Sequence, residues 1–272
     1  MLIREYRIVM PISVEEYQVG MLWSFAEASK AETGGGEGVE IIKNEPYDNY
    51  PLLNGQYSSG QYTEKIYHLE SKVPWLVKQI CPKGSLEFHE EAWNAFPYAK
   101  TVITNPGYMK EKFCITIETM SLPDRGTSEN ALQLSPEKLR QREVVHLDIC
   151  DPSRLAPTDM DPSTDPTKVT SMKAPDRFPL KPPGWQAKAE PVMCCYKLVS
   201  VEFKWFGLQT QVEKFAQKQY PRVFTKFHRE TVCWLDSWLG LTMADVREHE
   251  ERVKQELDQQ RKTGPIKGMV PV

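Results

Sequence analysis

The feature that most constrains the fold is a series of short segments in which apolar and polar residues alternate. Because successive side chains of a β-strand point to opposite faces, alternation predicts strands with one buried face. The alternating segments cover 2–11, a stretch that begins at Val39, 62–70, 86–90, 100–104, 113–119, 143–149 and 195–205. Few helical patterns separate them, so we predict a meandering antiparallel sheet.

A helix directly follows the first of these segments. Ser13 and Glu16 form a capping box, in which each side chain accepts a hydrogen bond from the backbone of the other residue. The periodicity predicts that this helix continues to about Ala31.

The last third of the sequence is also helical. The pattern from Gly207 to about Leu239 predicts a helix that is kinked or interrupted at Pro221, because proline has no backbone N–H to donate. Thr242 has an N-cap signature and opens a further helix over 242–262. We therefore predict an α+β fold with long helices at both ends of the chain.

The length of 272 residues fits one large domain or two small ones. Residues 151–185 contain eight prolines, a composition typical of a long surface loop. A linker between domains is the alternative interpretation. Because another strand follows at 195–205, we predict a single domain over 1–272.

Composition and charge exclude several classes of protein. The 34 Lys and Arg nearly balance the 37 Asp and Glu, so we expect no nucleic-acid partner. No apolar run reaches the roughly 18 residues of a transmembrane helix. The N-terminus lacks the apolar core of a signal peptide, and the six cysteines contain no C-x-x-C pair. We expect a cytoplasmic protein with reduced thiols and no metal site.

Several charged residues lie on faces that are otherwise apolar. Lys197 shares a strand face with Val199 and Val201, and Glu250 completes the apolar stripe of the last helix. On 62–69, Thr63 and Lys65 lie on one face. Buried ions destabilise a fold unless they are paired, so these positions require an explanation.

Two explanations remain open at this point. In the first, Lys197 or Lys65 forms a buried structural pair with Glu250. In the second, the residues line a cavity for a ligand with an anionic end that is rich in hydroxyl groups. The lysines would then bind a phosphate, Glu250 would bind vicinal hydroxyls, and Thr63 and Asn94 would supply further polar contacts.

Two apolar segments are candidates for contact with a membrane. One is 73–77 with 80–82, and the other is 205–208. Tryptophan beside other apolar residues in a loop or at a strand end suits a membrane interface. The alternative is that these are ordinary core aromatics.

At these residues the sequence resembles the phosphatidylinositol transfer proteins, and the resemblance covers nearly the whole chain. Its end soon after the last helix resembles the small, single-domain class I members. The strings that carry the resemblance are Glu16-Tyr17-Gln18-Val19-Gly20, Gly34-Gly35-Gly36-Glu37-Gly38-Val39-Glu40, Asn44-Glu45-Pro46-Tyr47, Gly60-Gln61-Tyr62-Thr63, Lys65-Ile66-Tyr67-His68-Leu69, Ala92-Trp93-Asn94-Ala95, Tyr196-Lys197-Leu198-Val199, Gly207-Leu208-Gln209 and Leu241-Thr242-Met243.

The resemblance implies a START-like (helix-grip) fold, in which a concave, mostly antiparallel sheet and long helices enclose one phospholipid. The helix over 242–262 would be part of a lid. The phospholipid would be cargo, with no cofactor and no catalysis. In the family, the inositol phosphate head is held by the residues that match Thr63, Lys65, Glu90, Asn94, Thr101, Lys197 and Glu250.

The resemblance also implies how the protein meets a membrane. Residues 72–84, with Trp75 and Leu76, match a lipid-exchange loop, and Trp205 with Phe206 matches a membrane-docking aromatic pair. The pair is usually two tryptophans, and phenylalanine lacks the indole N–H that anchors tryptophan among headgroups.

Further positions bear on regulation. A family cysteine near the headgroup is here Ala99, so we expect no inhibition by thiol reagents there. Ser171 matches a phosphorylation site of the family, whereas the adjoining loop 174–180 departs from the family pattern.

The expected partners are phosphatidylinositol, phosphatidylcholine and, transiently, the surface of intracellular membranes, and we expect a monomer. Two other functions remain open. One is an enzyme that uses the same pocket, with His68, His89 or His228 and Glu90 as acid or base. The other is a sensor that holds lipid without transferring it.

Overall fold

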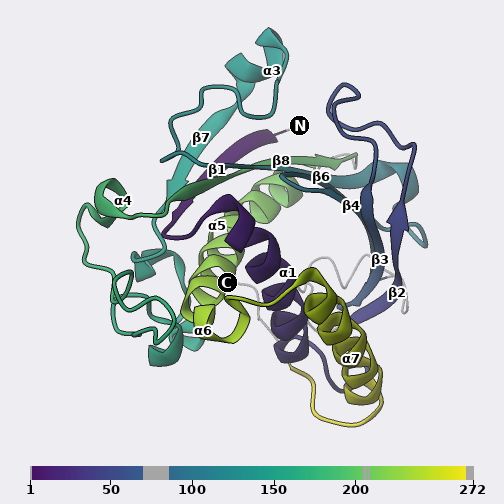
Figure 1. Ribbon diagram of the computed structural model, residues 1–272. Coiled ribbons are helices and arrows are strands. Elements are labelled where there is room, and N and C mark those ends of the chain that lie inside the picture. The colour runs from purple at the N-terminus through teal and green to yellow at the C-terminus, as the bar shows by residue number, and fades with distance from the viewer. Residues whose placement is uncertain (1, 70–85, 205–206, 208, 268–272) are drawn as a thin grey trace.

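The computed structural model describes residues 2–69, 86–204, 207 and 209–267. Its centre is an eight-stranded sheet that curves around three long helices (Figure 1). The order of strands across the sheet is β2-β3-β4-β5-β6-β8-β1-β7. Sheet and helices together form an α+β fold, which confirms the predicted class.

The alternating segments of the sequence form the strands. The strands are β1 (Leu2–Met10), β2 (Gly38–Tyr47), β3 (Gly60–His68), β4 (Glu87–Ala95), β5 (Tyr98–Thr104), β6 (Phe113–Leu122), β7 (Glu143–Leu147) and β8 (Met193–Phe203). The α-helices are α1 (Val14–Ala31), α3 (Pro136–Gln141), α4 (Trp185–Lys188), α5 (Gln209–Cys233), α6 (Leu235–Trp238) and α7 (Met243–Lys262). The 3-10 turns are η1 (Lys110–Lys112), η2 (Pro152–Arg154), η3 (Pro157–Asp159) and η4 (Pro162–Thr164).

The sheet is mostly antiparallel, as predicted, but it departs from a meander at one edge. β7 pairs with β1 in parallel, with Tyr6 opposite Val145, while β1 also pairs antiparallel with β8. A parallel neighbour requires a crossover connection, because a tight turn reverses the chain. Here α1 and strands β2 to β6 lie between β1 and β7 in the chain and make this connection.

The N-terminal helix begins where the sequence predicts. Ser13 accepts a hydrogen bond from the backbone of Glu16, and the Glu16 side chain accepts one from the backbone of Ser13, so the capping box is confirmed. Gly20 lies against Trp238 of α6, where an added Cβ would come within 2.8 Å of the indole ring. A side chain at this position would therefore separate α1 from α6.

The sequence predicts a kink or an interruption at Pro221, and the interruption is wrong, because α5 continues through Pro221 to Cys233. Proline at this position leaves the carbonyl oxygen of Gln217, four residues earlier, without its helical donor. The Tyr6 hydroxyl and the Arg4 guanidinium both donate to that oxygen, at 3.2 and 3.3 Å. Side chains of β1 thus replace the missing hydrogen bond and tie α5 to the sheet.

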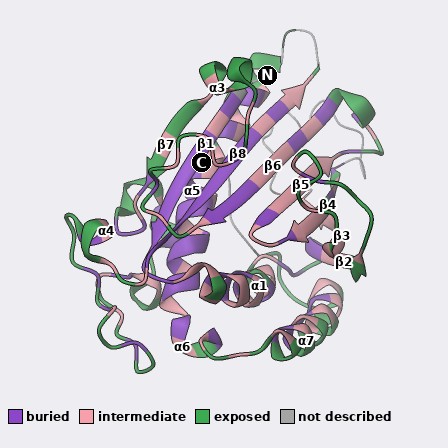
Figure 2. Ribbon diagram, turned by 45° about the horizontal axis from the view of Figure 1, so that its top comes forward, coloured by how far each residue is buried: buried purple, intermediate pink, exposed green. Residues whose placement is uncertain are grey.

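The helices cover the concave face of the sheet (Figure 1). α5 packs on β1 and β8, whereas α7 packs on α1 and β2. The buried residues concentrate in β1, β8 and the adjoining part of α5 (Figure 2). Among the described residues, none of the helices combines the length and hydropathy that crossing a bilayer requires.

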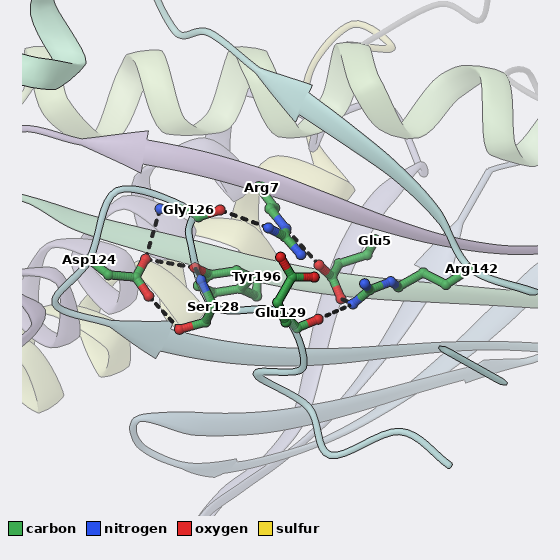
Figure 3. A network of polar contacts seen from close by, with 8 residues as sticks. All are labelled: Glu5, Arg7, Asp124, Gly126, Ser128, Glu129, Arg142 and Tyr196. Atoms are coloured by element: carbon green, nitrogen blue, oxygen red, sulfur yellow. Dashed lines mark hydrogen bonds and ion pairs between the residues drawn. The ribbon is translucent and has the colours of Figure 1, made fainter. Parts of the chain in front are cut away.

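A buried network of charges lies on the other face of the sheet (Figure 3). Glu5 is fully buried, and its carboxylate accepts hydrogen bonds from Arg7 at 2.8 Å and from Arg142 at 2.6 Å. Arg7 also donates to the carbonyl oxygen of Gly126, and the Tyr196 hydroxyl donates to Asp124. The network attaches the segment after β6, and the residue that precedes β7, to the centre of the sheet.

The proline-rich segment 151–185 contains the three turns η2 to η4 and lies along α5. The Asp159 carboxylate forms a two-point ion pair with Arg222 of α5, at 2.6 and 2.9 Å, and both side chains are almost completely buried. Arg229 of α5 pairs with Asp165. These ion pairs attach the segment to the helix.

Candidate functional site

Six of the seven residues that the sequence assigns to a headgroup site lie on the concave face of the sheet. Residues opposite each other in an antiparallel pair share a face. Lys65 is opposite Glu90, and Thr63 is opposite Ala92, which is opposite Thr101. Gln61 is opposite Asn94.

The same face continues through β6 to β8. Thr101 is opposite Ile117, and Thr119, two residues further along β6, is opposite Lys197. Lys65 and Lys197 are four strands apart in the order of the sheet, which corresponds to about 19 Å along a flat sheet. Strands β3 and β8 belong to the same curved sheet (Figure 1), and strand pairing puts the two lysines on the same face of it.

Lys65 belongs to a half-buried polar cluster. Its Nζ lies 3.1 Å from Oε1 of Glu90, and the Tyr67 hydroxyl donates to Oε2 of Glu90 at 2.7 Å. Burial, followed by the charge of Glu90, raises the pKa of Tyr67 well above its ordinary value, so the hydroxyl stays protonated as a donor. Lys65 Nζ also lies 5.7 Å from the centre of the Phe25 ring on α1.

Lys197 is in a different electrostatic environment. Only 6% of its surface is exposed, and its Nζ donates to the Thr119 hydroxyl at a long 3.4 Å. Nζ also lies 5.3 Å from the centre of the Phe224 ring on α5. Within the described ranges it forms no ion pair with a carboxylate. A buried ammonium without an anionic partner is unfavourable, so this position favours an anionic ligand.

Glu250 extends from α7 toward the edge of the sheet. Its carboxylate accepts a hydrogen bond from Asn44 of β2 at 3.0 Å and forms an ion pair with Arg247 of the same helix. Asn44 in turn accepts a hydrogen bond from Gln61 at 2.6 Å. The structural pair of Glu250 with Lys65 or Lys197, one of the two explanations above, is absent among the described contacts.

A pocket of about 470 Å³ lies between the sheet and the helices at this end. Asn94 lines it from β4, Gln18 from α1, and Arg247 from α7. The side-chain oxygen of Asn94 is buried without a hydrogen-bond partner in the described part of the chain. An unsatisfied acceptor that borders a cavity is suited to a ligand hydroxyl group.

Thr63 and Thr101 also have no hydrogen-bond partner for their hydroxyl groups among the described residues. They are half-buried and flank Ala92 on the concave face. The small side chain of Ala92 leaves space between them. The described polar groups of this face therefore include two hydroxyls and one amide oxygen without a hydrogen-bond partner, and one ammonium without an anionic partner.

Sequence reasoning missed part of this site. Thr119, Tyr67 and Asn44 contact the predicted residues but were not assigned to them. Tyr67 is two residues from Lys65, and the alternation alone places it on the same face. No local signal marks Thr119 or Asn44, because strand pairing brings them to the site.

Ser171 is buried where its loop contacts α6. Its hydroxyl donates to Asp236 at 2.5 Å and accepts from the backbone N–H of Ala174 at 2.8 Å. With 7% of its surface exposed, the side chain is inaccessible to a kinase in this conformation.

The four residues assigned to membrane docking, Trp75, Leu76, Trp205 and Phe206, lie outside the described residues, as does the exchange loop 72–84.

Of the histidines considered for catalysis, two lie on the other face of the sheet from Lys65, and the third is buried in the core. His68 and His89 lie on the face opposite Lys65 and Glu90, and His68 pairs with Glu40 at 2.8 Å. His228 is fully buried, accepts a hydrogen bond from Tyr17 at Nε2 and donates from Nδ1 to the carbonyl oxygen of Phe224. Among the described residues, no group of three His, Cys, Asp or Glu is arranged to hold a metal ion.

Comparison with known proteins finds relatives that match nearly the whole chain. Residues 1–255 match the family described as Phosphatidylinositol transfer protein. The sequence is 52% identical over 272 residues to the phosphatidylinositol transfer protein beta isoform of Homo sapiens, with 98% of this chain and 97% of the relative covered. It is 46% identical over 258 residues to phosphatidylinositol transfer protein 1 of Dictyostelium discoideum, with 94% of each chain covered.

A larger relative matches through a small part of its length. The membrane-associated phosphatidylinositol transfer protein 1 of Mus musculus is 41% identical over 263 residues, which are 95% of this chain and 20% of that protein.

Proposed function

The chain belongs to the phosphatidylinositol transfer protein family, and we propose that it binds one phospholipid molecule beneath its helices and carries it between membranes. The observation that carries this proposal is the environment of Lys197. It is a buried ammonium on the concave face that forms no ion pair within the described residues. The phosphate of a lipid headgroup supplies the missing negative charge.

We assign the headgroup contacts by their chemistry. Lys197 and Lys65 bind the phosphate, and Glu90 and Tyr67 hold Lys65 in position. Glu250 accepts hydrogen bonds from vicinal hydroxyls of the inositol ring.

The neutral polar groups complete the contacts. Thr63, Asn94 and Thr101 bind further inositol oxygens, and Asn94 and Arg247 line the adjoining pocket from the sheet and the helix. Thr119 joins this set because its hydroxyl already contacts Lys197.

Phosphatidylcholine is the second lipid that we assign to this site. It has the same phosphate and acyl chains but no ring hydroxyls, so it uses the lysines without using Glu250. The carrier acts as a monomer in the cytoplasm and contacts intracellular membranes transiently.

The energetics explain why a carrier is needed. Burial of one CH₂ contributes about 0.8 kcal/mol, so two acyl chains lose on the order of 25 kcal/mol when they enter water. An enclosed apolar region replaces the membrane during transfer, and it must open at the bilayer. We assign that motion to α7, which packs on α1 and on β2 at the edge of the sheet.

No catalytic step is part of this proposal. His228 is enclosed by the core, and the other two candidate histidines point away from the lysines. Polar groups on the concave face are arranged to bind a charge and hydroxyls.

Native mass spectrometry of protein purified from eukaryotic cells tests the proposal. We expect one phosphatidylinositol or phosphatidylcholine per chain, identified after organic extraction, and exchange of that lipid between donor and acceptor vesicles. Protein that is free of lipid would contradict the carrier function. Bound lipid without vesicle-to-vesicle transfer would favour the sensor.

A further inference from the structure

A second cavity lies on the flank of α5. Its volume is about 670 Å³, and it is bounded by α5, by the first part of the 151–185 segment and by the start of β1. None of the seven predicted headgroup residues lines it. It is therefore a separate feature from the site described above.

The lining of this cavity is strongly basic. Its charged residues are Arg4, Arg154, Lys214, Lys218 and Arg222, and none of the described residues that line it is acidic. Two of the five already have partners in the fold: Arg4 pairs with Glu143 at 2.7 Å, and Arg222 pairs with Asp159.

The other three cations are available to a ligand. Arg154, Lys214 and Lys218 are exposed, and none forms a hydrogen bond or ion pair with another residue of the described ranges. Three cations that converge on one cavity repel each other, because opposite charges are absent from its lining. An anion in the cavity would remove this repulsion.

The spacing on α5 confirms that the charges share one helix face. Lys214, Lys218 and Arg222 follow at intervals of four residues, which places their side chains on the same side of the helix. The helix positions three and four residues from Lys214 and Lys218 hold no acidic residue. Surface helices commonly offset lysines with glutamates at these positions, and Lys214 and Lys218 have no such neighbour.

The wall opposite α5 is held firmly. Arg222 binds both oxygens of Asp159, and one of these oxygens also accepts the backbone N–H of Ala156, which lines the cavity. These contacts fix the backbone of this wall relative to α5, which reduces the entropy lost when a ligand binds between them.

We propose that this cavity, between Arg154 of η2 and Lys214 and Lys218 of α5, is a second anion site that binds a polyphosphate or phosphomonoester group distinct from the carried lipid. Guanidinium and ammonium groups are strong donors to phosphate oxygens, and three cations match a group with several negative charges. The same chemistry occurs in soluble polyphosphates and in anionic headgroups of a membrane surface. Both sources are compatible with a cavity whose cations are exposed.

Isothermal titration calorimetry with inorganic tripolyphosphate tests the soluble source. Tripolyphosphate has no inositol ring, so binding to it does not depend on the hydroxyl contacts proposed for Glu250. The variant is Lys214→Ala with Lys218→Ala. The matched control is Lys181→Ala with Lys188→Ala, which removes the same charge at two exposed lysines outside the cavity.

Sedimentation with vesicles tests the membrane source with the same three proteins. One set of vesicles contains phosphatidylcholine alone, and the other contains phosphatidylcholine with phosphatidic acid. We expect the cavity variant to lose about tenfold in affinity for tripolyphosphate, for the phosphatidic acid vesicles or for both, and the control to keep the affinity of the original protein.

The pattern of results decides the source. Loss confined to tripolyphosphate identifies a soluble anion, whereas loss confined to vesicles identifies a membrane headgroup. Equal affinities of the cavity variant and the control in both assays would overturn the proposal, as would absence of binding by the original protein in both. Unchanged thermal unfolding and unchanged lipid content of the variants show that the fold and the main site are intact.

Discussion

Lys65 and Glu90 are direct cross-strand partners on β3 and β4, with Nζ of the lysine 3.1 Å from Oε1 of the glutamate. Tyr67 donates to the other oxygen of the same carboxylate. An ammonium group has three N–H donors, so Lys65 retains two for a ligand while Glu90 balances its charge. The pair therefore holds a cation on the concave face and leaves two N–H donors of that cation available to a ligand.

The proposed role of Glu250 predicts a change in lipid selectivity. Because Glu250 accepts hydrogen bonds from inositol hydroxyls, Glu250→Ala should lower phosphatidylinositol transfer about tenfold or more, with a smaller effect on phosphatidylcholine. Lys65→Ala should lower the transfer of both lipids, because both carry the phosphate that we assign to Lys65. Transfer of the two labelled lipids between vesicles measures the ratio of the phosphatidylinositol rate to the phosphatidylcholine rate.

Glu251→Ala is the control for this experiment, because Glu251 is the next residue of α7 and is exposed. It should leave both rates unchanged. If Glu250→Ala reduced the transfer of both lipids equally, the assigned headgroup roles would be wrong.

The buried network of Figure 3 predicts a large effect on stability. Glu5→Gln removes the negative charge shared by Arg7 and Arg142, whose side chains are about as buried as that of Glu5. Breaking a buried ion pair destabilises a protein by about 3–5 kcal/mol, because the remaining charges stay uncompensated. Urea unfolding measures the difference in the free energy of unfolding.

The control is Glu143→Gln, which breaks the more exposed pair with Arg4. Such pairs contribute about 0–1 kcal/mol, so this variant should remain close to the original protein. Similar losses in the two variants would mean that burial does not increase the contribution of this network to the free energy of unfolding.

His228 makes stability depend on pH. Burial, and next the charge of Lys197, lowers its pKa from 6.5 to about 3. Between these values the unfolded chain binds the proton and the folded protein does not, so the free energy of unfolding falls as the pH drops below 6.5. This residue alone should reduce stability by about 2 kcal/mol at about pH 5 relative to neutral pH.

His228→Asn tests this pH dependence. The asparagine amide can still donate to the Phe224 carbonyl, but it does not titrate. We expect a smaller slope of unfolding free energy against pH between about pH 5 and neutrality. His146→Asn, at an exposed strand position, is the control. An unchanged slope in His228→Asn would assign the pH dependence to other groups.

Local patterns predicted those parts of the fold that depend on neighbours in the sequence. Alternation located the strands, and the Ser13 and Thr242 caps located the starts of α1 and α7. The same alternation placed Thr63 and Lys65 on one face, and strand pairing brings Glu90 and Lys197 to it.

The parts that sequence reasoning missed depend on long-range contacts. The parallel pairing of β7 with β1 joins residues more than a hundred positions apart, and no local pattern encodes it. Pro221 disrupts a helix in isolation, but here Tyr6 and Arg4 satisfy the carbonyl oxygen that it leaves free. Similarly, Asn44 gained a role only when β2 and α7 came together.

The final prediction concerns Lys197, where binding and stability should change in opposite directions. Lys197→Met removes a buried charge that forms no ion pair among the described residues and replaces it with an apolar side chain of similar length. We expect the free energy of unfolding to stay the same or to rise, while phosphatidylinositol binding falls. The pKa of His228 should also rise from about 3, because Lys197 contributes to its depression, and NMR titration of the imidazole measures this.

Lys65→Met is the matched comparison, because it makes the same substitution on the same face. It leaves the Glu90 carboxylate, 9% exposed, without the cation 3.1 Å away, and so it should destabilise the fold as well as weaken lipid binding. The two lysines would then differ in one respect. The positive charge of Lys65 is balanced by a carboxylate of the protein, whereas that of Lys197 is balanced only by the ligand. If Lys197→Met destabilised the protein as much as Lys65→Met, Lys197 would be a structural residue, and the phosphate would have to be bound elsewhere.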